Sequence, residues 1–217
     1  VSSGRKAPLK ILSPQRNVVA YALSNEVRSW LNSLPWALRA QAYRSLKTNP
    51  WSNVPASQNF LFIHVPKTGG TAVTRALGIG SSWHPKLEEY YAHDPARADN
   101  LFKFAFVRNP WDRLVSSFHY TKGRNNSIVE KQWSDRWLAD CDNFSSFLVK
   151  LKKSSVFQRV VTVHPMFEPQ FKFVQHKRHL CLDYVGKQES LEEDVKHVCA
   201  LLGRPHPSLE MINTSKR

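Results

Sequence analysis

The stretch "NFLFIHVPKTGGTAV", residues 59–73, decides the fold, because an uninterrupted apolar strand runs into a short glycine-containing loop and then into a helix-like pattern. An apolar strand without polar alternation, such as 59–65, is typical of a parallel sheet that is buried on both faces. Two later segments, 101–107 and 179–185, repeat the pattern, and a helix signal follows each. We therefore predict an α/β fold of three layers, in which helices flank a central parallel sheet. Ligands in such folds bind beyond the carboxyl ends of the strands.

The helix after the third predicted strand carries both a start and a stop signal. Ser190 and Glu193 have the S-x-x-E spacing of a capping box, and Gly203 is placed to end the helix. Its apolar stripe consists of Leu191, Val195, Val198 and Leu202.

The loop after the first strand has the features of an anion site. Gly69 and Gly70 let the backbone curl so that successive N–H groups point inward at the start of a helix. Thr68 and Thr71 add hydroxyl donors, and Lys67 adds a positive charge. The fold is thus P-loop-like, but a Walker A loop places its Lys after the glycines, whereas here Lys67 precedes them. The alternative is a plain Gly-Gly turn beside an exposed Lys.

The second strand leads into "VRNPWDRLVSSF", residues 107–118, which carries a second candidate anion site. Arg108 ends the strand, Asn109 can cap the helix, and Ser116 follows two turns later, so Arg108 and Ser116 can clamp a phosphate. The alternative is an ion pair of Arg108 with Asp112. A magnesium-dependent kinase usually ends such a strand in Asp, so an Arg here weighs against that class. Three apolar residues are expected to pack the helix on the sheet: Leu114, Val115 and Phe118.

Together, "HVPKTGGTA" and "FVRNPWDRLVSSF" resemble the two signature elements of the sulfotransferases that use 3'-phosphoadenosine 5'-phosphosulfate. The resemblance is nearest to the branch of bacterial and Golgi carbohydrate sulfotransferases of the heparan 2-O type. "DYVGKQESLEEDVKHVCALLG" resembles a later strand–helix element of that branch, and "MINTSKR" resembles its Asn-x-Ser segment. These blocks are scattered over residues 59–217.

The resemblance implies a donor site and a reaction. It implies that the 5'-phosphosulfate is wrapped by Lys67, Thr68, Gly69, Gly70, Thr71 and Ala72. It implies that Arg108 and Ser116 bind the 3'-phosphate, and that Gly186, Lys187 and Ser215 lie near the adenosine. The reaction implied is metal-independent, in-line transfer of the sulfuryl group to an acceptor hydroxyl, with 3'-phosphoadenosine 5'-phosphate as product. Lys67 is placed to stabilise the leaving phosphate.

The acceptor hydroxyl needs a base, and the resemblance favours His84 in "SSWHPKLEEYY". The alternative is that His84 is an ordinary loop residue. The other candidates for the base are Glu88, Glu89, His119 and His164, whereas His64 inside the first strand is interpreted as structural. Five aromatic residues are candidates for an acceptor pocket: Trp83, Tyr90, Tyr91, Trp133 and Trp137.

The net charge of +14 implies an anionic partner, such as a nucleic acid, an acidic membrane, an acidic glycan or the donor itself. Residues 1–58 carry eight Lys and Arg against one acid, and are predicted to be a basic helical extension and linker before a sulfotransferase domain at 59–217. That extension is a candidate for membrane-surface contact or homodimerisation. A nucleic-acid-binding protein is the rival from another class, but no reading element is apparent, so we expect a glycan or small metabolite as partner.

Three cysteines without a CxxC pair argue against a zinc site and against a disulfide framework, and Cys199 is predicted to be a buried thiol. The cellular compartment stays open. A start at Val1 and the sequons at Asn125, Asn143 and Asn213 fit a truncated enzyme of the Golgi lumen, whereas a bacterial enzyme would be cytoplasmic.

Overall fold

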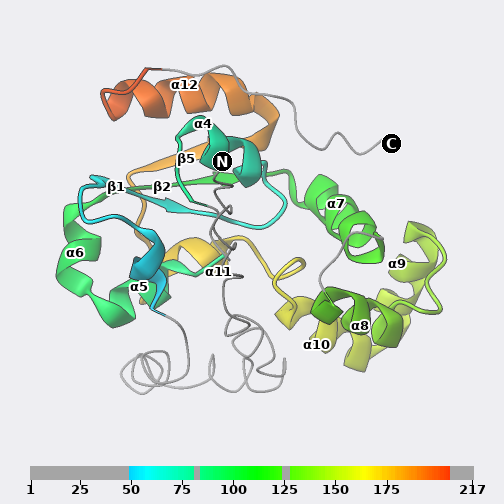
Figure 1. Cartoon of the computed structure of the whole chain (residues 1–217). Helices are drawn as coiled ribbons and strands as arrows, with labels where there is room; N and C mark the ends of the chain where they lie inside the picture. Colours follow the sequence, from blue (N-terminus) through cyan, green and yellow to red (C-terminus); the bar gives the residue numbers. More distant parts are fainter. Residues whose placement is uncertain (1–48, 81–83, 124–127, 206–217) are drawn as a thin grey trace, which may run out of the picture.

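A computed structural model describes residues 49–80, 84–123 and 128–205 of the chain. Its centre is a parallel sheet of three strands, β1 (Phe60–Ile63), β2 (Phe102–Val107) and β5 (Tyr184–Lys187), in the order β1-β2-β5 (Figure 1). Phe60 pairs with Phe102, and Phe104 pairs with Tyr184. The predicted α/β fold with a central parallel sheet is therefore confirmed. The predicted N-terminal helices and Ser215 lie outside the described residues.

Helices cover both faces of the sheet. Above it in Figure 1 lie α4 (Gly70–Ala76) and α12 (Leu191–Leu201), and below it lie α5 (Leu87–His93), α6 (Pro95–Asn100) and α11 (Phe171–Val174). Side chains alternate along β1 between two buried clusters, because successive strand residues face opposite sides. Phe60 and Phe62 pack with residues of α4 and α12, whereas Leu61 and Ile63 pack with residues of α5 and α11. This arrangement gives the three predicted layers.

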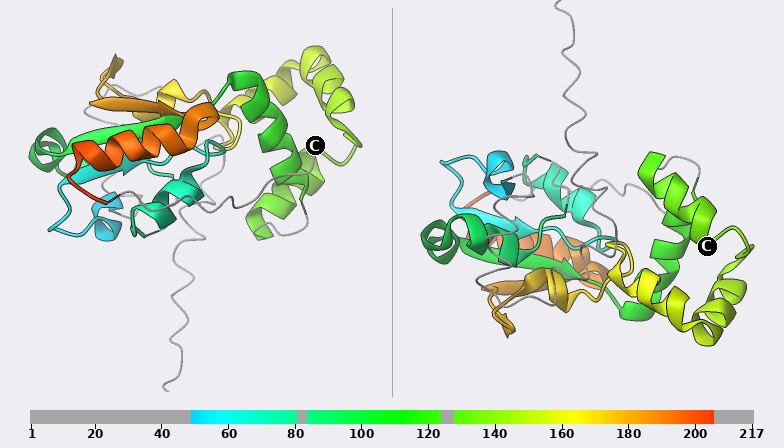
Figure 2. Two further views of the ribbon diagram at one scale, coloured as in Figure 1. Left: turned by 90° about the horizontal axis from the view of Figure 1, so that it is seen from above. Right: turned by 90° about the horizontal axis from the view of Figure 1, so that it is seen from below.

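A helical lobe lies beside the sheet (Figures 1 and 2). It consists of α7 (Pro110–Lys122), α8 (Ile128–Trp137), α9 (Phe144–Lys153) and α10 (Ser155–Val163). Leu114 and Phe118 of α7 pack in this lobe with residues such as Phe147 and Phe157 of α9 and α10, and Val115 is half-buried. The prediction that α7 packs on the sheet was wrong, because its apolar stripe meets the equally apolar faces of α9 and α10.

The third predicted strand, 179–185, was placed wrongly. Its first part, β4 (His179–Leu180), pairs with β3 (Gln175–His176) in a separate hairpin whose strands have two residues each. Only its end enters the sheet, as β5. The hairpin turn is formed by Lys177 and Arg178, whose φ angles are 48° and 70°. Asp183 then joins the sheet edge, since its N–H donates to the Lys103 carbonyl at 2.7 Å and its carboxylate accepts from the Lys103 N–H at 2.6 Å.

The predicted capping box at the start of α12 is also wrong. Ser190 is the N-cap residue, but its hydroxyl makes no capping bond and donates to the Asp194 carboxylate at 2.8 Å. The same carboxylate accepts from the Lys187 N–H and the Tyr184 hydroxyl, each at 2.7 Å. Although burial raises the pKa of Asp194, these hydrogen bonds hold it below its ordinary value. Asp194 therefore ties the end of β5 to α12.

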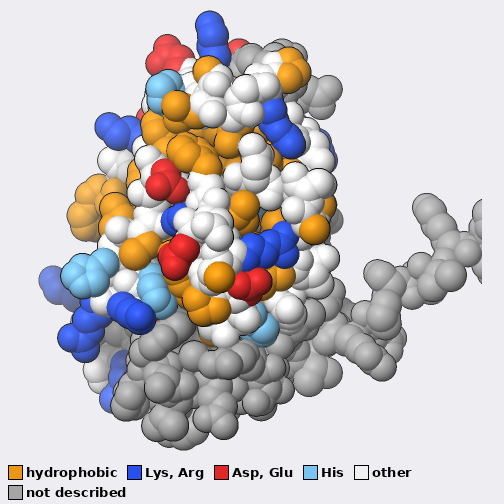
Figure 3. Space-filling view, turned by 90° about the vertical axis from the view of Figure 1, so that its left-hand side faces the viewer, with side chains coloured by type: hydrophobic (Ala, Val, Ile, Leu, Met, Phe, Trp, Pro, Cys, Tyr) orange, Lys and Arg blue, Asp and Glu red, His pale blue; other side chains and the backbone are white. Residues whose placement is uncertain are grey.

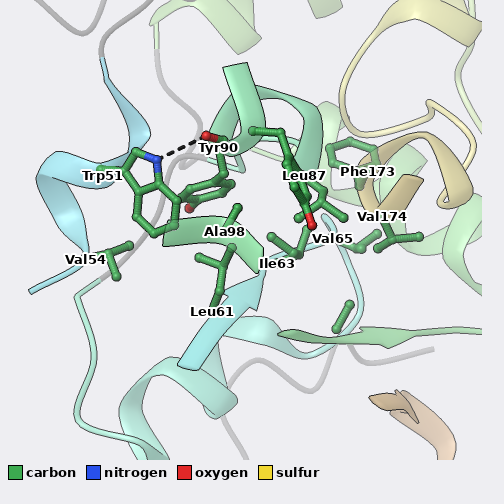
Figure 4. Packing of buried hydrophobic residues seen from close by; sticks show 12 residues of the cluster. Trp51, Val54, Leu61, Ile63, Val65, Leu87, Tyr90, Ala98, Phe173 and Val174 are labelled. Atoms are coloured by element: carbon green, nitrogen blue, oxygen red, sulfur yellow. Dashed lines mark hydrogen bonds between the residues drawn. The ribbon is translucent and has the colours of Figure 1, made fainter. Parts of the chain in front are cut away.

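The buried cluster that contains Leu61 and Ile63 also includes the segment before β1 (Figure 4). Trp51, in a short 3-10 helix (Pro50–Asn53), is buried, and its indole N–H donates to the Tyr90 carbonyl at 3.1 Å. Tyr90 is itself buried in this cluster, and Tyr91 stacks on His176 at 3.9 Å between ring centroids. The hypothesis that these two tyrosines line an acceptor pocket is therefore replaced by a core role.

The predicted boundary at residue 58, between an N-terminal extension and the sulfotransferase domain, stays a prediction.

Two further findings concern the described residues. Their three cysteines are free, and Cys199 is buried in the cluster of α4 and α12, which confirms the predicted buried thiol. None of their helices is long and apolar enough to span a bilayer. Figure 3 shows one face of the molecule, on which Lys and Arg side chains are interspersed with acidic and apolar ones.

Candidate active site

The loop between β1 and α4 forms a concave row of backbone donors. Lys67 and Gly69 adopt left-handed φ angles of 67° and 83°. Such alternation in successive residues turns neighbouring N–H groups toward one point and makes an anion-binding nest. Within the described part of the chain, none of the N–H groups of residues 67–71 donates to a backbone oxygen. The loop therefore has free donors where an anion is expected.

The side chains of the loop take different roles. The Thr68 side chain is buried, and its hydroxyl donates to the Val65 carbonyl at 2.9 Å. This hydroxyl therefore closes the loop, and the expectation that Thr68 contacts the donor stays a prediction that would use its backbone N–H. Thr71 is exposed on the first turn of α4, and Ala72 is half-buried.

Both glycines are required by their surroundings. A Cβ on Gly69 would lie 2.8 Å from a methyl carbon of Leu191, in addition to the strain of the left-handed φ. A Cβ on Gly70 would lie 2.1 Å from the His64 ring. The backbone of the loop therefore lies directly against α12 and the end of β1.

Two cations meet at this loop. The ammonium of Lys67 lies 4.2 Å from the ring centroid of Tyr120, and Nη1 of Arg108 lies 3.5 Å from the Lys67 carbonyl. Burial, and then the charge of Arg108, lowers the pKa of Lys67. The backbone of Arg108 is fixed by Gln170, which accepts from its N–H at 2.9 Å and donates to its carbonyl at 2.8 Å. Nε of Arg108 is buried and has no hydrogen-bond partner among the described residues, as expected of a donor awaiting an anion.

The other predicted donor-site residues lie on neighbouring elements. Ser116 is half-buried on α7, two turns after Arg108. Gly186 and Lys187 end β5 and pair with Phe106 and Val107, so Lys187 lies beside the strand end that carries Arg108. Gly186 has a packing reason, because a Cβ there would lie 2.5 Å from the Phe106 ring.

His84 faces the loop from the segment before α5. Its Nδ1 lies 2.9 Å from the His64 carbonyl, and because a carbonyl only accepts, Nδ1 carries the proton. The lone pair of the neutral ring is therefore on Nε2. Burial lowers the pKa of His84 and outweighs the bond to His64, which raises it; the charge of Lys67 lowers it further, and that of Glu130 raises it. His84 is thus neutral at neutral pH, with a nitrogen able to accept a proton.

His64 supports this arrangement. Its ring is buried 4.2 Å from the His84 ring, between centroids, and burial followed by the charge of His84 sets its pKa well below the ordinary value. The position is consistent with the structural role predicted for His64.

The other candidates for the base are distributed over the fold. Glu88 and Glu89 are buried in α5, and His119 is exposed on α7. His164 is buried, with Nε2 3.4 Å from a carboxylate oxygen of Glu130. Trp133 and Trp137 pack at the edge of the lobe cluster, and Trp83 lies outside the described residues.

Sequence reasoning missed Arg113. Its guanidinium is buried and donates to the carbonyls of Pro66 at 3.3 Å and Met166 at 3.2 Å, and to those of Phe167 and Glu168. Burial lowers the pKa of Arg113 to about 10, against the charge of Glu168. A signal was present, since Arg113, Ser117 and Thr121 recur at four-residue spacing and form the buried polar face of α7.

Comparison with known proteins decides the family. The sulfotransferase family model matches residues 53–216, which is more than half of the chain. The chain belongs to the sulfotransferase family. The predicted family is thereby confirmed, and the heparan 2-O branch stays a prediction. Among the described residues of the chain, no group of three or more His, Cys, Asp and Glu is placed to hold a metal ion.

Individual relatives match about half of the chain. It is 26% identical over 120 residues to an uncharacterized protein of Archaeoglobus fulgidus, covering 54% of this chain and 80% of that protein. It is 28% identical over 120 residues to carbohydrate sulfotransferase 11 of Rattus norvegicus and of Mus musculus, covering 49% of this chain and 34% of each relative. The chain thus spans about a third of the length of these two enzymes. No solved structure is significantly similar to it.

Proposed function

We propose that this sulfotransferase moves a sulfuryl group from 3'-phosphoadenosine 5'-phosphosulfate to a hydroxyl group of a carbohydrate. The observation that carries the proposal is the meeting of three features at the carboxyl ends of β1 and β2. These are the nest at 67–71, the cations of Lys67 and Arg108, and the neutral His84. The carbohydrate acceptor is supported by the names of the two mammalian relatives.

The residues present fit a donor with two separate anionic groups. The nest and Lys67 suit the phosphosulfate end, and the residues assigned to it are Lys67, Thr68, Gly69, Gly70, Thr71 and Ala72. Arg108, with its orphaned Nε, and Ser116 suit the 3'-phosphate. Gly186, Lys187 and Ser215 are proposed for the adenosine end.

In the proposed reaction, each protein group has a defined task. The bound donor supplies an activated sulfuryl group. Nε2 of His84 accepts the proton of the acceptor hydroxyl while that oxygen bonds to sulfur. Lys67 stabilises the electron pair that the broken sulfur–oxygen bond leaves on the phosphate. The lowered pKa of His84 keeps it unprotonated and ready for this task.

Calorimetry with 3'-phosphoadenosine 5'-phosphate, in the presence of a chelator, tests the donor site. We expect binding by the wild type. Each hydrogen bond to a charged group contributes about 1.5–3 kcal/mol, so Arg108→Ala should weaken binding roughly 10- to 150-fold. Lys67→Ala should reduce transfer more than binding. Lys131→Ala is the control, because this exposed Lys pairs with Asp135 on α8. A wild type that does not bind the diphosphate contradicts the proposal.

A transfer screen tests the acceptor. Labelled donor is offered with desulfated heparan, other glycans, phenols and small metabolites. Label in a glycan fraction, lost in His84→Ala, supports the carbohydrate acceptor and the role of His84. Label only in phenols or small metabolites contradicts the carbohydrate acceptor.

A further inference from the structure

A buried turn at residues 164–168 lies between the two halves of the candidate active site. The His164 carbonyl accepts from the N–H groups of Phe167 at 2.9 Å and Glu168 at 2.8 Å, which makes the turn compact. Ser117 of α7 donates to the Met166 carbonyl at 2.6 Å. The turn is thus fixed to α7, and it connects the helical lobe to α11.

One side of the turn is tied to the anion-binding loop through Arg113. The guanidinium donates to three carbonyls of the turn, and it also reaches the Pro66 carbonyl, one residue before Lys67. The peptide held in this way leads directly into the left-handed Lys67. A strained conformation persists only when its surroundings fix it, and Arg113 supplies such a contact from a buried position.

The other side of the turn is tied to the segment of His84 through Glu168. A carboxylate oxygen of Glu168 lies 2.6 Å from the ammonium of Lys86, and both side chains are buried or nearly so. Lys86 follows His84 by two residues, with the buried Pro85 between them. Lys172 lies farther from the same oxygen, at 3.8 Å, and is more exposed.

We propose that Arg113, Glu168 and Lys86 are positioning residues that set the separation between the Lys67 loop and His84. The inference rests on the proposed function, because it assigns the two held segments to the donor and to the base. A buried ion pair adds little net stability compared with apolar residues of the same volume. A role in fixing the geometry of the active site explains why three charged side chains are buried, or nearly so, at this turn. A misplacement of about 1 Å in an active site can cost on the order of 100-fold in rate.

Two variants separate the two arms. Arg113→Lys keeps the charge beside Glu168 but loses the planar fork, so the donor arm is released. We expect the dissociation constant of 3'-phosphoadenosine 5'-phosphate to rise at least tenfold. We also expect faster amide hydrogen exchange at Ala72 and Val73, whose N–H groups donate to the Gly69 carbonyl of the loop at 2.9 and 3.3 Å. Lys86→Met releases the base arm and leaves Arg113 beside Glu168. We expect affinity for the diphosphate within about twofold of wild type, whereas nitrogen NMR should show His84 losing its fixed Nδ1–H tautomer.

Matched variants make the test specific. Glu168→Gln keeps the backbone carbonyl that Arg113 binds, so it should reproduce the NMR change of Lys86→Met and leave amide exchange at Ala72 and Val73 slow. It replaces Lys86→Met if that variant does not fold. Lys131→Met, which breaks the exposed pair with Asp135, should change neither readout. The proposal is overturned if a folded Arg113→Lys keeps wild-type amide exchange at Ala72 and Val73, or if a folded Lys86→Met keeps the His84 tautomer. Exchange and NMR need no ligand, so they decide the matter even if the wild type does not bind the diphosphate, which would count against the proposed function alone.

Discussion

Gly70→Ala should destabilise the protein through one steric contact. The new Cβ would lie 2.1 Å from Cδ2 and 2.2 Å from Nε2 of His64, where real Cβ atoms are essentially never found. The His64 ring cannot easily move away, because it stacks on Phe62 at 5.6 Å and meets His84 at 4.2 Å, between centroids. The φ angle of Gly70 is not left-handed, so backbone strain adds nothing to this cost.

The magnitude follows from overpacking. Forcing an extra methyl group into a packed site costs typically about 1–3 kcal/mol. In a protein of this size, 1 kcal/mol moves Tm by about 2–4 °C, so Tm should fall by roughly 2–12 °C. Urea unfolding followed by circular dichroism measures the free energy directly. Because the His64 carbonyl holds Nδ1 of His84, the displacement should also loosen the candidate base.

Two comparisons make the prediction refutable. Gly80→Ala is the matched control, because no described heavy atom lies within 4 Å of its new Cβ and its φ is not left-handed either. Combining Gly70→Ala with His64→Ala should recover about 1 kcal/mol relative to the sum of the single changes, since the methyl group enters the vacated space. Equal urea midpoints for Gly70→Ala and Gly80→Ala would refute the contact.

Three more predictions concern other parts of the site. Folding lowers the pKa of both His64 and His84 below the 6.5 of an unfolded chain. The stability that the two neutral rings contribute is therefore complete above about pH 6.5, and it is lost as pH falls toward their pKa values in the folded protein. A free energy of unfolding that stays flat from pH 7 to pH 5 contradicts this prediction. Asp194→Ala removes three hydrogen bonds and should cost about 1–3 kcal/mol in urea unfolding, whereas no loss would mean that β5 and α12 are held otherwise. Lys67→Gly should be more stable than Lys67→Ala by about 1 kcal/mol, because only Gly adopts a left-handed φ without strain, and neither should transfer sulfate.

Sequence alone predicted the features that depend on neighbouring residues. The apolar runs of β1 and β2, the glycines after β1 and the Arg at the end of β2 all carry their information within a few positions. Asn109 shows this well, since its side chain accepts from the N–H groups of Trp111 and Asp112 as the predicted cap of α7. Parallel pairing then brings the ends of β1 and β2 to one edge, which unites the two candidate anion sites.

What sequence did not predict depends on distant partners. The four-residue spacing of Arg113, Ser117 and Thr121 marks a polar face of α7, but it does not say what that face contacts, because the acceptors of Arg113 lie 47 and 53 to 55 positions away. The apolar run at 179–185 was predicted to be one strand, because nothing local shows that its first residues pair back across the left-handed turn at Lys177 and Arg178. The face of α7 that meets the lobe was likewise invisible, since a helical stripe does not say which surface it will cover.

The left-handed φ of Lys67 gives a physical reason why the Lys of this loop precedes the glycines. A left-handed φ at a residue with a side chain costs about 1–2 kcal/mol, and a Gly at this position would avoid that cost. A Gly would also remove the only side chain that carries a cation into the curve of the loop itself. The strained Lys is held by Arg113 on the Pro66 carbonyl, by Arg108 on the Lys67 carbonyl, and by the Thr68 hydroxyl on the Val65 carbonyl. A loop with its Lys before the glycines thus carries a cation on its own backbone, and three contacts around it maintain the conformation that this requires.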